Sequence, residues 1–472
     1  MKSEHRAVLQ SPVLRSRIAV PAAVIVALSA CAKEKGTVEL ADPVALSSPT
    51  TVGTAPMFAV SRKGAQAVAW VSAPDGGTDG RLYVSVGSAA PVEIRDKLGP
   101  IEPHGESPPK LSYAPDGGLY SIYAVARVVP GQRFPQSALR LVKSLDGGKS
   151  WTAPVTVTQK EVWGSHSFHA LHVAADGTVY VSWLGKGGEG AAAKAAMQSA
   201  AAKSEASSPA KPASGSHSMH GSTGAWIARS EDGGVTWADP VRVDMGEACP
   251  CCRTSVVSAK NGTIFMAWRH VYPGNVRDVV VAQSSDQGAT WSDPVKVHAD
   301  NWVFDACPHA GPAMSIDDKG VLHVTWWTGK EGIAGVYYAQ STDGAKSFKE
   351  PVAMGVAQFS RPAHVQLALA SNGRVIVAWD DGTKQVPEVV TRVSNDGGAT
   401  FGEPAIVSAQ GRAATFPVLS VAGDSVAIAW SEESAASSSS AAAAKAKMDK
   451  NAPHGLKAVG GAQVLVRRGL LQ

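Results

Sequence analysis

Apolar and polar residues alternate along this chain in short runs, and no helical spacing of apolar residues is sustained after the N-terminal segment. Gly177-Thr-Val-Tyr-Val-Ser-Trp183 and Gly262-Thr-Ile-Phe-Met-Ala-Trp268 show the pattern, a turn residue followed by an alternating strand. A period of two places successive side chains on opposite faces of a sheet. The 47 glycines and 29 prolines among 472 residues favour short strands joined by turns. The chain is therefore predicted to be all-β.

An aromatic residue recurs within these alternating strands, in most copies six positions after a turn residue that is usually glycine. The seven copies are Trp70, Tyr123, Trp183, Trp268, Trp326, Trp379 and Trp430. Successive copies are 51–60 residues apart, except for an interval of 85 residues between Trp183 and Trp268. A repeat of about this length indicates one four-stranded propeller blade per copy.

A second repeat reads Ser-x-Asp-x-Gly-x-Ser/Thr-Trp/Phe. Its five copies begin at Ser144, Ser230, Ser284, Ser341 and Ser394, and the copy at Ser341 has Ala345 in place of glycine. The Asp can accept hydrogen bonds from the backbone of its own turn, and the Gly allows a positive φ. These motifs resemble the Asp boxes of sialidase-like propellers, and the resemblance covers essentially the whole chain after the N-terminal segment. It implies a propeller, which the repeats make seven-bladed, with six blades as the alternative.

A third repeat, Pro-Val or Pro-Ala, opens a short strand after each Asp-box position. Its seven copies are Pro43, Pro91, Pro154, Pro240, Pro294, Pro351 and Pro404. The first copy precedes any strand of its own blade, so residues 42–48 are predicted to pair beside the strand near Gln463–Arg468. This pairing would close the ring and leave no long open sheet edge.

The N-terminus has the features of an export signal. Residues 1–30 carry a basic start and an apolar run that is too short to span a bilayer. Leu-Ser-Ala-Cys31 resembles a bacterial lipobox, which predicts lipidation of Cys31, a tether at 31–41 and anchoring in the cell envelope. Ala32 favours the outer membrane over the inner. The alternative is an ordinary signal peptide with a chance cysteine.

Two Ala-, Ser- and Lys-rich segments, 186–222 and 434–461, interrupt the propeller of residues 42–472 and are predicted to be disordered. Without residues 1–30 the chain has 40 basic and 39 acidic side chains. Such a balance offers no basic field for nucleic acid, so a nucleic-acid partner is not expected.

Candidate chemistry gathers in the connections between blades, which lie on the face opposite the Asp boxes. Cysteine and histidine side chains there suit copper or zinc. The candidate metal ligands are Cys249, Cys251, Cys252, Cys307, His309, His166, His169 and His364. His104 and Glu106 lie in a connection of the same kind, and His217, His220 and His454 lie in the two inserts, which would project from the same face.

Structural disulfides are the alternative to a metal site. Four cysteines remain besides Cys31, and an even number in an exported protein usually means disulfides. A bridge from Cys249 or Cys252 to Cys307 would join blades four and five. At least one cysteine of the Cys249–Cys252 run is expected to lie within disulfide or shared-metal reach of Cys307.

The resemblance to sialidases leaves two classes of function open. Active sialidases bind a substrate carboxylate with three arginines; Arg253 and Arg361 are candidates for this role, but there is no comparable third arginine and no Phe/Tyr-Arg-Ile-Pro motif. No catalytic residue can be assigned. A binding or assembly module with a metal, glycan or envelope-protein ligand is therefore favoured, and an exo-sialidase or another glycoside hydrolase is the alternative.

Overall fold

The computed structural model describes residues 36–74, 77, 79–132, 135–186, 223–433 and 462–472. The described residues form strands, turns and loops but no helix. This part of the chain therefore has no helix that could cross a membrane. The N-terminal unit, Met1–Glu34, lies outside this part, as do Cys31 and nearly all of both predicted inserts. Every described strand belongs to the unit Lys35–Gln472.

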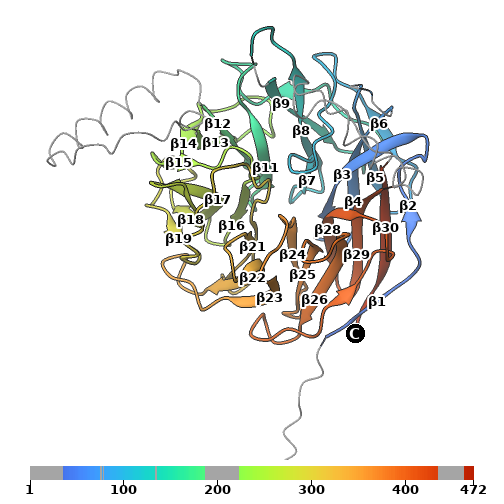
Figure 1. Cartoon of the computed structure of the whole chain (residues 1–472). Helices are drawn as coiled ribbons and strands as arrows, with labels where there is room; N and C mark the ends of the chain where they lie inside the picture. Colours follow the sequence, from blue (N-terminus) through green and yellow to red (C-terminus); the bar gives the residue numbers. More distant parts are fainter. Residues whose placement is uncertain (1–35, 75–76, 78, 133–134, 187–222, 434–461) are drawn as a thin grey trace, which may run out of the picture. The chain divides into compact units, whose positions relative to one another are not determined.

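The described strands form seven antiparallel sheets, which are the seven blades of a β-propeller (Figure 1). Blades one to three contain β3 (Thr51–Val60), β4 (Gln66–Pro74), β5 (Arg81–Val86) and β6 (Val92–Ile94); β7 (Lys110–Tyr113), β8 (Leu119–Arg127), β9 (Gln136–Ser144) and β10 (Val155–Thr156); and β11 (Ser167–Val173), β12 (Val179–Gly185), β13 (Gly224–Ser230) and β14 (Val241–Arg242).

The next three blades repeat this order, and blade four has an additional short strand at its start. Blades four to six contain β15 (Glu247–Ala248), β16 (Ser255–Ser258), β17 (Ile264–Tyr272), β18 (Val276–Ser284) and β19 (Val295–Lys296); β20 (Ala313–Ile316), β21 (Leu322–Thr328), β22 (Ala334–Ser341) and β23 (Val352–Ala357); and β24 (Val365–Leu369), β25 (Val375–Asp381), β26 (Glu388–Ser394) and β27 (Ala405–Ile406).

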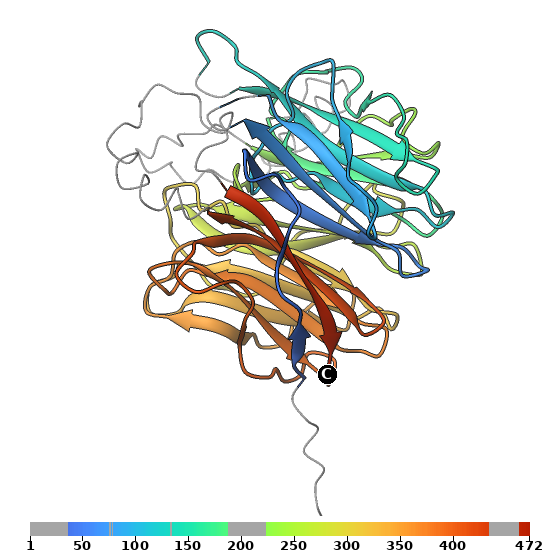
Figure 2. The ribbon, with the colours of Figure 1, turned by 90° about the vertical axis from the view of Figure 1, so that its right-hand side faces the viewer.

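Blade seven closes the ring with both ends of the described chain. Its strands are β28 (Ala414–Ala422), β29 (Ser425–Glu433), β30 (Ala462–Leu471), β1 (Val38–Leu40) and β2 (Val44–Ala45). Val44 pairs with Val466 in β30, which confirms the predicted closure. Figure 2 shows the blue start of the described chain, with β1 and β2, running beside this dark red strand. β1 also pairs with β30, so the segment 31–41, expected to be only a tether, contains a strand.

The hydrophobic core lies between the blades. The seven repeated aromatic side chains are each 0–2% exposed, and they occupy the second strand of each blade, within the strand and not at its end. Trp268 of blade four, for example, packs in one cluster with Tyr180 and Ile227 of blade three. First strands of neighbouring blades contact one another around the ring, so the residues that precede them lie near its axis (Figure 1).

The Asp boxes form the turns between the third and fourth strands, as predicted. Asp232 accepts hydrogen bonds from the backbone N–H of Val235 at 3.0 Å and of Thr236 at 2.9 Å, and from the Thr236 hydroxyl at 2.6 Å. Gly234 has a φ of 86°, and Ala345 holds the equivalent position in the fifth box with a φ of 63°. Each box is thus satisfied within its own turn.

Candidate metal centre at the channel mouth

Five connections lead into the first strands of blades two to six and together form the mouth. They are residues 102–110, 164–169, 249–254, 304–311 and 360–364. The Cys249-Pro-Cys-Cys252 run of the mouth links β15 to β16. Cys249 donates its backbone N–H to Arg269 O, and a turn returns Cys252 N to within 3.5 Å of Cys249 O. Cys249 Sγ lies 3.7 Å from Cys251 Sγ and 3.4 Å from Cys252 Sγ, and all three side chains are buried.

A second group of donor atoms joins this run to the next connection. Cys307 and His309 lie between β19 of blade four and β20 of blade five. One ligand atom each from Cys251, Cys307 and His309 lie within 4.8 Å of one another, and those of Cys249, Cys251 and Cys252 do the same. Cys251 therefore belongs to both groups. The expected proximity of the Cys249–Cys252 run to Cys307 is present in the structure.

Two buried arginines lie beneath the cysteines. Arg277 donates from Nη1 to Cys249 Sγ at 3.0 Å and from Nε to Phe304 O. Arg269 donates to the backbone oxygens of Arg277 and two other residues, Ala310 and Trp327. Neither guanidinium pairs with a carboxylate among the described residues, although the exposed fractions of the two residues are only 0% and 4%. Buried charges are normally paired. The side-chain partner of Arg277 is the sulfur of Cys249, and that of Arg269 is the ring of Trp302, whose centroid lies 5.3 Å from Arg269 Cζ.

The two arginine charges and burial give the three thiols different pKa values. Burial raises the pKa of Cys249, but hydrogen bonds from the Cys251 and Cys252 thiols and the charges of Arg277 and Arg269 outweigh burial and hold its pKa well below 9. Burial raises the pKa of Cys251 and Cys252 well above that value. Cys249 is therefore the most readily ionised of the three thiols, because its sulfur lies beside the other two and beside the Arg277 guanidinium.

An ion pair crosses the mouth near the axis. Glu106 Oε2 lies 3.1 Å from Arg253 Nη1, and Glu106 Oε1 accepts hydrogen bonds from the backbone N–H of Arg253 at 3.1 Å and of Gly311 at 2.6 Å. Arg253 also donates to Val365 O. These contacts connect blades two, four, five and six. Burial and the charge of Arg253 lower the pKa of the nearby Lys110 to about 7, against the opposing effect of Glu106.

Histidine and phenylalanine rings form the remaining wall. The His104 ring lies 5.5 Å from that of His309 and edge-on to Phe168 at 5.6 Å. Burial, with the charges of His309 and His364, lowers the pKa of His104 to about 4. Phe168 and Phe416 have φ values of 58° and 54° at bulges in β11 and β28. Bulges redirect side chains, and here they turn both phenylalanine rings toward mouth histidines.

His364 packs on Phe416 with ring centroids 3.8 Å apart. Its Nδ1 lies 2.6 Å from Asp380 Oδ2, and Asp380 also accepts hydrogen bonds from the backbone N–H of His364 and of Phe416. Burial lowers the pKa of His364, but the charge and hydrogen bond of Asp380 outweigh it and raise the pKa overall. A histidine held in this way has a fixed ring orientation.

The other predicted residues lie apart from both donor groups. His166 bonds to the backbone oxygen of Ser137 and packs edge-on against Trp183. His169 lies 3.4 Å from the Ser107 hydroxyl, and burial lowers its pKa to about 3. Among the described residues, none of the three predicted ligands His166, His169 and His364 belongs to a group that could hold a metal ion.

The two arginines proposed for a substrate carboxylate are both engaged. Arg253 is paired with Glu106, and the guanidinium of Arg361, a partly exposed side chain, donates to the backbone oxygens of Lys384 and Gln385. Sequence reasoning missed Arg269, which follows the apolar run Ile264–Trp268 within the central strand Ile264–Tyr272. A charge at such a position is the signal that could have identified it.

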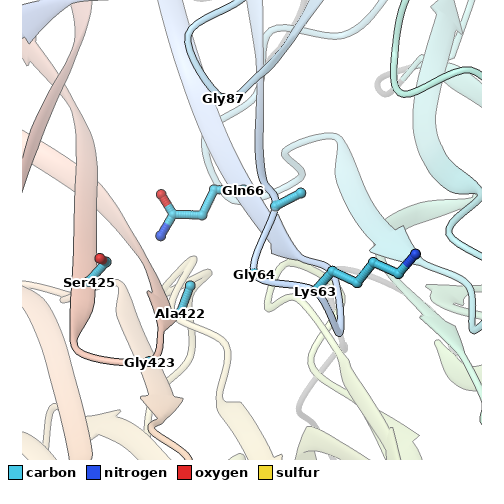
Figure 3. A pocket seen from close by; sticks show the side chains of 8 residues that line it. Lys63, Gly64, Gln66, Gly87, Ala422, Gly423 and Ser425 are labelled. Atoms are coloured by element: carbon cyan, nitrogen blue, oxygen red, sulfur yellow. The ribbon is translucent and has the colours of Figure 1, made fainter.

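A hollow of about 610 Å³ lies on the opposite face, between the β3–β4 and β28–β29 turns (Figure 3). Glycine and alanine form most of its lining, together with Lys63, Gln66 and Ser425. Figure 3 shows the Gln66 side chain extending toward the strand of Ser425, whereas the Lys63 side chain points away from both, so the one charged group does not join the other polar groups. The mouth, in contrast, brings sulfur, imidazole and charged groups together.

Comparison with known proteins finds one matching family model and several similar solved structures. A family model described as BNR repeat-like domain matches residues 102–303. No curated protein matches the sequence. Similar solved structures include a protein of unknown function from Dyadobacter fermentans (17% identity, TM-score 0.49, covering 92% of this chain and 99% of that one). Another is the Hadza microbial sialidase Hz136 (18% identity, TM-score 0.44, covering 78% of this chain and 75% of that one). A third is a variant of the NanB sialidase from Streptococcus pneumoniae (10% identity, TM-score 0.45, covering 78% of this chain and 80% of that one). None of these matches bears on the ligand of the mouth.

Proposed function

We propose that this chain, a β-propeller of the BNR-repeat, sialidase-like type, is an envelope binding protein whose mouth holds a soft metal ion, with Cu(I) favoured over Zn(II). One observation carries the proposal: ligand atoms of Cys251, Cys307 and His309, from two different connections, lie within 4.8 Å of one another. Two sulfurs and an imidazole form a ligand set that suits Cu(I). Structural zinc usually takes four protein ligands, one more than this group offers.

The buried arginines support a metal–thiolate site more than a disulfide. A disulfide is neutral and would leave Arg269 and Arg277 without an anion. A reduced and ionised Cys249–Cys252 run supplies one beside the proposed ligands, because Cys249 Sγ lies 3.0 Å from Arg277 Nη1. The backbone of the run is also fixed, because Cys249 N bonds to Arg269 O within the blade. The run that carries Cys251 is therefore held by the sheet framework before any ion binds.

The predicted export signal and the lipobox at Cys31 assign the proposed function to the cell envelope. The proposed protein is attached to the membrane by a lipid at Cys31, in the outer membrane, and its natural partner is an envelope protein that delivers or receives the ion. Glycan binding with exo-sialidase or other glycoside hydrolase activity ranks below this proposal, because Arg253 is paired with Glu106 and Arg361 is held by backbone oxygens.

The test is a Cu(I) titration of reduced protein under anaerobic conditions against a competing Cu(I) chelator. The wild-type chain is expected to take Cu(I) from the chelator, and Cys307→Ser and His309→Ala are expected to weaken binding by roughly 100-fold or more, because each removes a direct ligand. Cys31→Ser is the matched control and should bind as the wild type does.

A structural disulfide predicts the opposite set of results. Protein purified without reductant would then lack the corresponding free thiols, and Cys307→Ser would lower the free energy of unfolding by about 2–5 kcal/mol without changing metal binding. That combination would overturn the proposed function.

A further inference from the structure

We infer that the mouth binds two Cu(I) ions, not one, and that the sulfur of Cys251 bridges them. The inference rests on the proposed function and extends it. Both donor groups contain Cys251: one with Cys307 and His309, the other with Cys249 and Cys252. A thiolate has enough lone pairs to bind two metal ions. Cys251 can therefore be a ligand in both groups at the same time.

The distances in the Cys249–Cys252 run are those of a nearly formed site. Three sulfurs around one ion, at a metal–sulfur distance of about 2.3 Å, would lie roughly 3.8–4.0 Å from one another. Cys249 Sγ is 3.7 Å from Cys251 Sγ and 3.4 Å from Cys252 Sγ. A small outward movement of the sulfurs would therefore admit an ion.

The surroundings of this second ion exclude water. Cys249 and Cys252 are each 0% exposed, and Cys251 is 3% exposed. Phe168 and Val271 pack against the three cysteines. A soft ion with sulfur ligands needs no water molecule to complete its shell, which suits Cu(I) in this apolar pocket.

Charge balance favours two monovalent ions. When all four cysteines are ionised, their charges are cancelled by two Cu(I) ions and by the cations of Arg269 and Arg277, which have no carboxylate partner among the described residues. Two divalent ions would leave an uncompensated positive charge in a buried site, which is costly. Each cysteine that is still protonated releases its proton to solvent as its sulfur binds copper, and no electron is transferred.

The stoichiometry of Cu(I) binding tests this inference, with Cys31→Ser as the background so that four thiols remain. The reduced full-length chain is expected to bind two Cu(I) ions. Cys252→Ser and Cys307→Ser should each lose one ion, and the double variant should lose both. The loaded chain should show the luminescence of a water-shielded Cu(I)–thiolate cluster, and each single variant should lose most of that emission.

The possible results separate the two proposals. If the chain binds no Cu(I), the proposed function fails and this inference fails with it. If it binds one ion, and Cys252→Ser leaves that ion in place, the proposed function stands and the bridged pair is wrong. Two ions that persist in Cys252→Ser also contradict the bridged pair. Cys252→Ala, checked by thermal unfolding, replaces the serine variant if the serine variant does not fold.

Discussion

The two faces of this propeller are built in different ways. On one face, five Asp boxes repeat nearly the same turn, and each carboxylate is satisfied by residues no more than four positions away. On the other face, the connections share no motif, and their buried polar groups find partners far away in sequence. Glu106 is 147 positions from Arg253 and 205 from Gly311. The repeated face builds the fold, and the departures from the repeat mark the site.

This difference implies that the mouth depends on the completed ring. An Asp-box turn can form as soon as its own hairpin forms, because its hydrogen bonds are local. The Glu106–Arg253 pair can form only when blades two and four have been placed around the axis. Substitutions at the mouth should therefore affect global stability more than substitutions at an Asp box.

Glu106→Ala is expected to have the largest effect. It leaves the Arg253 guanidinium buried without its carboxylate and should lower the free energy of unfolding by about 3–5 kcal/mol. Denaturant unfolding would measure the loss. The matched control is Asp239→Ala, which breaks the exposed ion pair with Lys160 on the Asp-box face and should cost about 1 kcal/mol or less. Equal effects of the two substitutions would remove the contrast between the faces.

Gly311→Ala should be the next most damaging change. A Cβ at this position would lie 2.3 Å from Arg253 O and 2.6 Å from Arg253 N, so blades four and five would have to move apart. The expected cost is about 1–3 kcal/mol, the usual range for overpacking. Gly99→Ala serves as the control, because its added Cβ would find its nearest neighbour at 3.5 Å. Thermal unfolding measures the stability of the two variants. An unfolding temperature of Gly311→Ala equal to that of the wild type would show that the mouth is loosely packed.

Asp286→Ala probes the other face and should cost about 1 kcal/mol, in the range of a lost cap or turn hydrogen bond. Hydrogen bonds from the side chain and backbone of Thr290 lower the pKa of Asp286 to about 2. Because the native pKa is depressed, this stabilisation is present above about pH 4 and is lost as the pH falls toward 2. Unfolding measured from pH 5 to 2 should show a weaker acid dependence in the variant than in the wild type. Parallel curves would contradict this role.

Asp380→Asn should change stability least near neutral pH, because the amide keeps the size of the carboxylate. Its main effect is on His364, since burial without the Asp380 charge lowers the pKa of this histidine. In the wild type, the raised pKa means that stabilisation is present below the ordinary value of 6.5 and is lost as the pH rises through the native pKa. The variant should reverse this slope. NMR titration of His364 measures the change, and an unaltered pKa would show that Asp380 does not control it.

The repeats predicted the architecture because each is local and recurs. Seven aromatic positions, the five Asp boxes and the early Pro43 together specified the blades and the closure. The proximity of Cys251 to Cys307 could be predicted because the two residues lie in the connections that lead into blades four and five, which are neighbours in the ring. The positions of His166 and His169 did not follow, because β11 contains a bulge between Ser167 and Ala170 that alters which way its side chains point. Alternation in the sequence does not reveal such a bulge.

The charged groups of the mouth were harder to interpret than its sulfurs. Glu106 and Arg253 both appeared among unusual residues, yet nothing in the sequence indicates that they pair with each other across the ring. Arg277 and Asp380 belong to strands that the repeats predict, one through the Asp box at Ser284 and the other through Trp379, and neither repeat involves the charged residue. Partners that lie far apart in sequence can be recognised only when the curvature of the ring is known.

X-ray absorption at the copper edge of the Cu(I)-loaded chain reports the ligands of the metal and so shows whether the mouth is a metal centre. The first shell is expected to be dominated by sulfur with an imidazole contribution, which is lost in His309→Ala, and the sulfur contribution is expected to be smaller in Cys307→Ser. A shell of oxygen and nitrogen atoms that is the same in the wild type and in both variants would contradict the assignment of the mouth as a metal centre.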